Sequence, residues 1–340
     1  MKKFLLLISF MVPMVTMAFT TATTENVKAN FAAHWTNNVY PRMYGSAEEV
    51  QRVKDLYEAN DPLVVKAVNA LLAEADAALT KPIPAWGLDD ANLRVSSVHT
   101  IAKEFAPQLT IAYMLTGDEK YAVRAWQVVQ TLYTYQDWGV QTESPWKDRH
   151  FLDTGIGAHN VAMLYDGLSG WMNEAQKDSL YQMSRKYVFL PAQKQYTGEA
   201  QRTWGWMYAN NNWNGICNGG IISACLTMME HEPDFLADIA ARAINCLPNY
   251  INSFEPDGQS EEGLMYWSYG LMYTITAFDV MNRVLGTTYG YADTNGMQKT
   301  GYFPVFTSGP VVSLNIGDDP IKNSRANSMF WFSKYLNSPA

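Results

Sequence analysis

The sequence predicts an all-α fold in which helical hairpins pack side by side as an α/α toroid or solenoid. Apolar residues recur with helical spacing along most of the 340 residues. Paired helical segments return every roughly 40 to 50 residues, and no strand-rich segment separates them. Because each hairpin needs its neighbours to bury its inner face, we expect one domain over about residues 30–340.

The first four predicted helices each have a recognisable boundary. Serine and aspartate favour helix N-termini, proline fits the first turn, and glycine favours the residue after a C-terminus. These helices are expected over 47–59 after Ser46, over 63–79 after Asp61 and Pro62, over about 98–115 before Gly117, and from Asp118 onward with Tyr121, Ala122, Ala125, Val128, Val129 and Leu132 on one side.

Two further hairpins and a long helix are expected in the second half. They are predicted over 159–171 with 173–189, over 214–229 with 233–254, and over about 262–284. Long loops, which are often functional, are expected at 81–92, 136–149, 197–212 and 287–308. The stretch 301–340 has a short β-like run at 310–315 and then becomes helical again.

The N-terminus has the pattern of a secretory signal peptide. Lys2 and Lys3 precede an apolar run over 4–17, and Ala18 is a small residue suited to cleavage. The run is shorter than the roughly 20 residues of a membrane span. We therefore expect removal of residues 1–18, a periplasmic or secreted protein, and no integral membrane span after signal removal.

Composition narrows the function classes. The net charge of −8 argues against a protein that coats nucleic acid. The 13% aromatic content is typical of sugar-binding clefts as well as of protein cores. Cys217, Cys225 and Cys246 allow either one disulfide or three free thiols. No zinc-ligand spacing occurs, so we expect no metal and no cofactor. The oligomeric state is left open.

An asparagine-rich segment is the densest polar cluster. Five Asn occur within the nine residues 210–218, and a helix start accounts for only one or two of them. Buried amides must be hydrogen-bonded, so this clustering favours a cleft lining. The residues expected to bind substrate here are Asn211, Trp213 and Asn214, with Trp204 and Trp206 just before them.

Two further segments carry candidate residues. After the turn at Asp257–Gly258, the residues Tyr266, Tyr269 and Tyr273 share one helix face, which fits either a core stripe or a cleft wall. Arg149 and His150 are expected in a loop where they could bind an anion. A histidine on a helix, such as His159, is more often structural.

The segments 210–220 and 257–269 together resemble the heparinase II/III-like polysaccharide lyases. Further matching motifs are Tyr40-Pro41-Arg42, Phe151-Leu152-Asp153-Thr154 and Tyr165-Asp166, and the resemblance covers about residues 35–335. It implies an incomplete (α/α) toroid followed by an antiparallel β-sandwich. It also implies β-elimination at a uronic acid of an acidic polysaccharide such as heparin, heparan sulfate or alginate.

The chemistry of elimination explains the residue types. The C5 proton is hardly acidic while the adjacent carboxylate is charged, so donors must neutralise that carboxylate. By resemblance, Asn212 matches the neutralising residue and Tyr266 the catalytic tyrosine, which acts as base and then as acid. Tyr269, also expected to bind substrate, is the fallback one turn later.

Two departures and two alternatives accompany this interpretation. Several relatives carry His where this chain has Trp213, and the chain ends at Ala340, where the β-sandwich is expected; a truncated chain could be inactive.

A glycoside hydrolase would need two carboxylates, with Asp148 or Asp153 opposite Glu261 or Glu262. A non-catalytic glycan-binding domain is the second alternative. Residues that could make the cleft basic are Arg94, Lys103, Lys147, Arg149 and Arg202.

Overall fold

The computed structural model describes residues 20–35, 39–91, 94–139, 151–199, 205–319 and 326–336. Within these ranges the regular structure is helical and contains no strand, which confirms the all-α prediction. The expected β-like run forms only an isolated bridge between Ser308 and Ser313. Its apolar side chains Val311, Val312 and Leu314 stay exposed. The predicted signal peptide lies outside the described residues.

The α-helices vary from single turns to a helix of 22 residues. A π-helical turn over Arg185–Phe189 joins two of them, and short 3-10 turns occur at Trp206–Tyr208, Asn252–Phe254 and Tyr291–Asp293. The helices are α1 (Thr24–His34), α2 (Ala47–Glu58), α3 (Pro62–Thr80), α4 (Ser96–Glu104), α5 (Ala106–Thr116), α6 (Glu119–Tyr133), α7 (Phe151–Leu168), α8 (Glu174–Ser184), α9 (Leu190–Thr197), α10 (Asn212–Thr227), α11 (Pro233–Cys246), α12 (Pro248–Ile251), α13 (Leu264–Leu285), α14 (Asn295–Thr300), α15 (Phe303–Thr307) and α16 (Ser328–Tyr335).

Local capping chemistry sets several boundaries as predicted. Ser46 and Glu49 form a capping box at the start of α2, and the Asp61 carboxylate accepts N–H groups at the start of α3. Asp118 does the same for α6, and α5 ends at Gly117 in the left-handed conformation. These interactions span only a few residues, which is why the sequence alone reveals them.

Proline divides two helices that were expected to be continuous. The expected helix over 98–115 is broken at Phe105, because Pro107 in the first turn of α5 has no N–H to donate back into α4. The expected helix over 233–254 likewise ends as α11, and Pro248 begins the short α12. Both predictions of one continuous helix were wrong.

Other differences lie at a helix start and in an expected loop. α7 begins at Phe151, eight residues before the expected start, and all of its residues are buried. Because α7 is buried on all sides, its apolar residues do not form a single stripe, and the helical periodicity does not mark where it begins. The expected loop over 287–308 instead contains α14 and α15.

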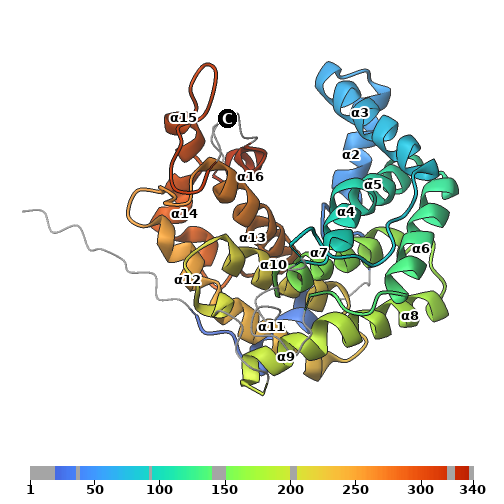
Figure 1. The fold of residues 1–340 in the computed structure, drawn as a ribbon, viewed down its shortest axis with the longest axis horizontal. Coiled ribbons are helices and arrows are strands. Elements are labelled where there is room, and N and C mark those ends of the chain that lie inside the picture. The colour runs from blue at the N-terminus through green and yellow to red at the C-terminus, as the bar shows by residue number, and fades with distance from the viewer. Residues whose placement is uncertain are drawn as a thin grey trace, which may run out of the picture.

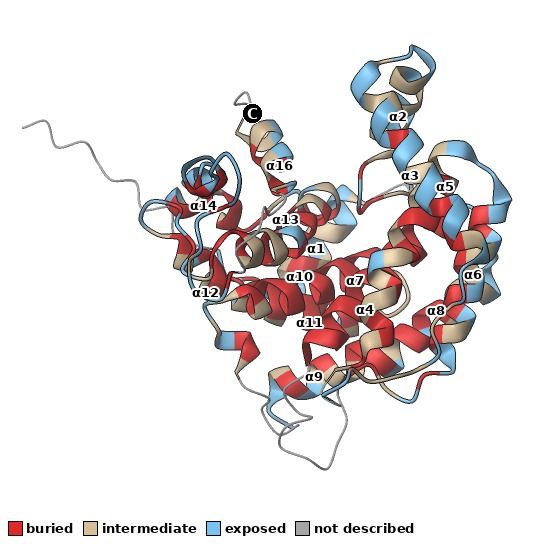
Figure 2. Ribbon diagram, turned by 45° about the horizontal axis from the view of Figure 1, so that its top comes forward, coloured by how far each residue is buried: buried red, intermediate tan, exposed pale blue. Residues whose placement is uncertain are grey.

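The centre of the molecule consists of α7, α10 and α13. α7 and α10 are buried along almost their whole length, whereas α2 and α3 are largely exposed (Figure 2). The backbones of α7 and α10 touch: a Cβ on Gly220 would overlap the carbonyl oxygen of Gly155, and one on Gly155 would lie 2.7 Å from the Cα of Cys217. Glycine is required at such a close approach.

Helices from near the two ends of the described chain lie on either side of this centre. α2 and α3 lie at one end of the molecule and α14 to α16 at the other, with α7 and α10 between them (Figure 1). Closure of the hairpins into an incomplete toroid stays a prediction. No helix among the described residues is both long enough and apolar enough to cross a membrane.

Candidate functional site

The first turns of α4, α7, α10 and α13 lie together. Asp153 in α7 accepts the backbone N–H of Val95, which immediately precedes α4, at 2.7 Å. Asn212 at the start of α10 donates to Glu262, two residues before α13. At the start of α13, Leu264 and Met265 donate their backbone N–H groups to Asp319, so carboxylates of the chain itself satisfy several N–H groups at these helix N-termini.

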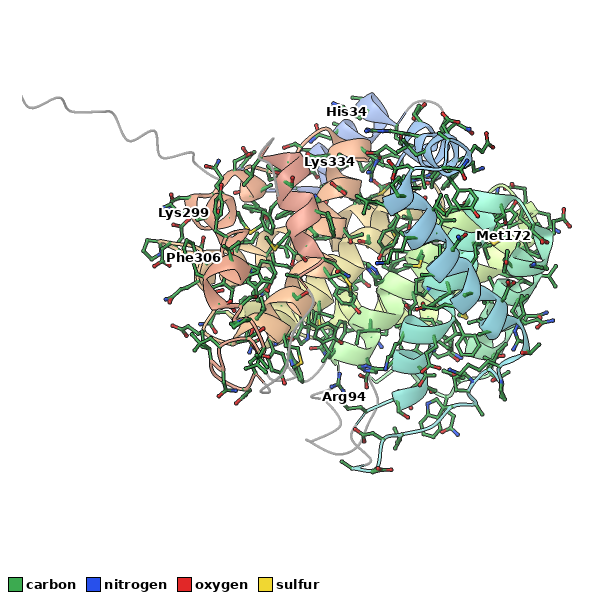
Figure 3. The ribbon with its side chains drawn as sticks, turned by 90° about the horizontal axis from the view of Figure 1, so that it is seen from above. His34, Arg94, Met172, Lys299, Phe306 and Lys334 are labelled. Carbon is green, nitrogen blue, oxygen red and sulfur yellow. The ribbon has the colours of Figure 1, made fainter. Side chains whose placement is uncertain are left out.

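A buried carboxylate organises the first part of the site. The Asp153 side chain is fully buried, and its Oδ1 lies 2.5 Å from Nε2 of His99 and 3.3 Å from Nε of Arg94. The side chains of Arg94 and His99 are 33% and 30% exposed. We call Arg94, His99 and Asp153 the Asp153 cluster. Figure 3 shows Arg94 at the edge of the molecule, beside the light-green ribbon of α7.

The contacts of the cluster fix its donors. Nε2 of His99 lies 2.5 Å from Oδ1 of Asp153 and 3.2 Å from Nη2 of Arg94. We assign the Nε2 proton to the shorter contact, with Asp153, and this assignment leaves the lone pair on Nδ1. The Nε of Arg94 donates to Asp153 and its Nη2 contacts Nε2 of His99, which leaves the other Nη N–H donors for a ligand. The cluster therefore places the positively charged guanidinium of Arg94 next to a proton acceptor, Nδ1 of His99.

The tyrosine face of α13 adjoins this cluster. Burial raises the pKa of the half-buried Tyr269 to about 12, while the positive charge of Arg94 acts in the opposite direction. Its ring meets that of Tyr273 edge-on at 5.8 Å, and Tyr273 is buried against His159 at 4.6 Å. Tyr266, one turn before Tyr269, is half-buried on the same face. Tyr273 therefore fits the alternative of a tyrosine that packs in the core, whereas Tyr266 and Tyr269 stay partly accessible to a ligand.

The asparagine cluster separates into different roles. Asn211 caps α10 by accepting the N–H of Trp213. Asn212 is almost fully buried, and one Glu262 carboxylate accepts both its backbone N–H at 2.7 Å and its Nδ2 at 2.6 Å. Burial raises the pKa of Glu262, and the two hydrogen bonds from Asn212 oppose that shift. Trp213 is half-buried.

Two residues expected to bind substrate are structural instead. Asn214 is fully buried, and its Nδ2 donates to the backbone carbonyls of Met207 and Cys246. Trp206 is fully buried and stacks on Phe151 at 4.4 Å. Both expectations were wrong, because Asn214 and Trp206 are 0% exposed and leave no atom that a ligand could reach. Arg149, His150 and Trp204 lie outside the described residues.

The motifs near residues 40 and 165 build the opposite end of α7. Asp166 accepts the backbone N–H groups of Arg42 and Met43, and the buried Arg42 pairs with Glu230 at 2.6 Å. The Arg42 guanidinium also lies over the ring of Tyr40. These contacts fasten the N-terminal segment to the core. A cavity of about 550 Å³ beside them is lined by Tyr40, Tyr165, Ser169, Gly170, Glu174, Lys177, Glu230 and His231.

The three cysteines have the properties of structural thiols. All three cysteines are free thiols, and burial raises the pKa values of Cys217, Cys225 and Cys246. In the part of the chain that the structure describes, no group of three or more His, Cys, Asp or Glu side chains could hold a metal ion. A redox or metal-binding role for these cysteines has no support in the geometry.

Two of the three residues of the Asp153 cluster are predicted from the sequence. Arg94 is among the residues expected to make the cleft basic and Asp153 is a candidate hydrolase carboxylate, whereas His99 is not singled out. His99 lies in the first turn of α4, but nothing in the local pattern links it to Asp153, which lies 54 residues away. Models of known protein families give no match to this chain, and neither do curated proteins. Membership of the heparinase II/III-like lyases therefore stays a prediction.

Proposed function

We propose that this protein is a polysaccharide lyase that cleaves a uronic-acid-containing polysaccharide by β-elimination. The observation that carries the proposal is the partly exposed pair Arg94 and His99, held on buried Asp153 next to Tyr269. These residues supply what elimination requires: a cation for the uronate carboxylate, an oriented proton acceptor and a proton donor.

The first step is neutralisation of the carboxylate. The remaining Nη N–H donors of Arg94 bind the uronate carboxylate next to C5. As the C5 proton leaves, charge moves onto this carboxylate. Preorganised donors stabilise that charge more strongly than water does. Asn212 contributes its remaining amide N–H at the start of α10.

The second step is proton transfer. Nδ1 of His99 takes the C5 proton, the C–H electron pair forms the C4–C5 double bond, and the bond from C4 to the glycosidic oxygen breaks. Tyr269 donates its phenolic proton to that oxygen. Because burial raises the pKa of Tyr269 to about 12, the side chain is a neutral phenol at neutral pH and suits the acid role. The resemblance assigns both proton transfers to Tyr266, so both tyrosines need testing.

A glycoside hydrolase fits the carboxylates less well. Asp153 is engaged by Arg94, His99 and Val95, and both oxygens of Glu262 accept hydrogen bonds from Asn212. Neither Asp153 nor Glu262 has the freedom of a nucleophile or of a base that activates water, and Asp148 lies outside the described residues. A glycan-binding domain without turnover requires no oriented His–Asp pair.

The proposal is tested by the product formed from acidic polysaccharides. Purified protein is incubated with alginate, with heparan sulfate and with neutral dextran as a control. Elimination creates a conjugated double bond that absorbs in the ultraviolet, together with a new reducing end. Reducing ends without ultraviolet absorbance would indicate hydrolysis instead, and binding without either product would indicate a glycan-binding domain.

We also propose that the lyase is exported, since residues 1–18 have the pattern of a cleaved signal. A periplasmic or secreted location would bring it into contact with extracellular polysaccharides. N-terminal sequencing of the expressed protein tests this: a mature chain that still begins at Met1 would contradict cleavage.

A further inference from the structure

Glu262 binds Asn212 in an unusual two-point arrangement. Its Oε2 accepts the backbone N–H of Asn212 at 2.7 Å, and its Oε1 accepts the side-chain Nδ2 at 2.6 Å. The two residues lie 50 positions apart, so the contact joins the start of α10 to the loop that precedes α13. No other described residue has a hydrogen bond to this amide.

The contact leaves half of the amide free. A primary amide has two N–H hydrogens, and a carboxylate can accept only from its nitrogen end. Glu262 therefore fixes which end of the Asn212 amide is the donor and uses one of its hydrogens. The second hydrogen and the carbonyl oxygen remain without a partner among the described residues.

The surroundings hold both partners in place. Gly263, which follows Glu262, has a φ of +84°, a backbone conformation that favours glycine. A Cβ on Gly270 would lie 3.0 Å from the Cα of Asn212, so α13 approaches the start of α10 closely. The carboxylate thus reaches Asn212 from a short, well-defined loop.

We propose that Glu262 is a positioning residue, which orients the Asn212 amide so that its second N–H points to the uronate carboxylate. This inference rests on the proposed lyase function for its catalytic consequence. Glu262 itself touches no reacting atom. Glu262→Gln keeps the size of the side chain but replaces one acceptor oxygen with an N–H group, which would face an N–H of Asn212. The orientation of the amide is then lost.

A double-mutant cycle tests the catalytic part. We expect Glu262→Gln to lower kcat about tenfold or more, because the transition-state donor is misplaced. If Glu262 acts through Asn212, adding Glu262→Gln to Asn212→Ala lowers kcat no further. Glu261→Gln, a charge loss at the exposed neighbouring position, is the matched control and should leave kcat unchanged. Additive losses in the double variant would overturn the proposal.

A second measurement does not depend on lyase activity. The side-chain amide signals of Asn212 are identified by NMR from their loss in Asn212→Ala. Glu262→Gln should shift both of these signals, and Glu261→Gln should not. If Glu262→Gln leaves them unmoved, the orienting contact is absent and the proposal fails. Shifted signals in a protein without lyase activity would refute the proposed function and retain the contact.

Discussion

Oδ1 of buried Asp153 lies 2.5 Å from Nε2 of His99, and this contact is shorter than the 3.2 Å between Nε2 and Nη2 of Arg94, so we assign the Nε2 proton to Asp153 and the lone pair of the imidazole to Nδ1. Asp153 also holds Arg94 and the N–H of Val95, so one carboxylate positions the guanidinium and the proton acceptor together. A buried carboxylate needs several donors to be stable, and here the donors are also the groups that face the proposed substrate.

Asp153→Asn tests whether this carboxylate orients His99. The amide cannot accept from His99 and Val95 as the carboxylate does, so the imidazole loses its fixed proton position. We expect kcat on a uronic-acid-containing polysaccharide to fall by about a hundredfold or more, the usual scale for general acid–base groups. The measurement is steady-state kinetics with a melting temperature for each variant.

Asp166→Asn is the matched control. Asp166 is equally buried on the same helix and accepts two backbone N–H groups, but it lies at the opposite end of α7. Its replacement should lower the melting temperature and leave kcat of the folded protein unchanged. Equal loss of kcat in both variants would mean that the effect comes from general destabilisation.

The two accessible tyrosines are separated by phenylalanine variants. Tyr269→Phe keeps the ring and removes the proton that the leaving oxygen needs, so kcat should fall by about a hundredfold or more. Tyr266→Phe should have a smaller effect if Tyr269 is the acid. The reverse order of effects would favour the role that the resemblance gives to Tyr266, and full activity of both variants would end the tyrosine mechanism.

Gly270 sets the distance between α13 and α10. A Cβ at this position would overlap the hydroxyl of Tyr250 as well as press on Asn212. Gly270→Ala should destabilise the protein by about 1–3 kcal/mol, the usual cost of overpacking, as measured by urea unfolding. Gly170→Ala is the control, because a Cβ there meets no atom within 4 Å. Equal stability of the two variants would contradict the close contact.

His159 makes the stability of the protein depend on pH. Burial lowers its pKa to about 3, so the folded protein holds this side chain neutral beside Tyr44 and Tyr273. The unfolded chain binds the proton with an ordinary pKa of about 6.5, so stability present above that pH is lost as the pH falls towards the folded value. Between pH 8 and pH 5 this removes about 2 kcal/mol.

Urea unfolding at several pH values measures the effect of His159. His159→Gln has no titrating group here, so its unfolding free energy should fall less between pH 8 and pH 5 than that of the parent protein. The same pH dependence in both proteins would show that His159 does not titrate on unfolding.

Local signals made much of the fold predictable from the sequence. Caps such as Ser46 and Asp118 act within one helical turn, and the face shared by Tyr266 and Tyr269 follows from their spacing alone. The start of α7 was not predictable in this way, because this helix is buried on all sides and its apolar residues do not form a single stripe. Pro107 divides a segment whose apolar pattern continues across the break.

The site was less predictable because its contacts are distant in sequence. Nothing local distinguishes Asn212, which meets Glu262, from Asn214, which is buried on two backbone carbonyls. The two residues are separated by about 200° around the helix axis, so they face different sides of α10. In the same way, the partner of Asp153 is a histidine on another helix, which only the packing of α4 against α7 reveals.

Ultraviolet absorbance of the conjugated double bond tests most directly whether the Asp153 cluster carries out elimination on a uronic-acid-containing polysaccharide. It is followed with the parent protein and with Arg94→Ala on alginate and heparan sulfate. We expect the absorbance to rise with the parent protein on at least one of these substrates, and to rise at least about tenfold more slowly with Arg94→Ala, because the carboxylate loses its cation. No absorbance change with either substrate, or the same rate in folded Arg94→Ala, would contradict the proposed site.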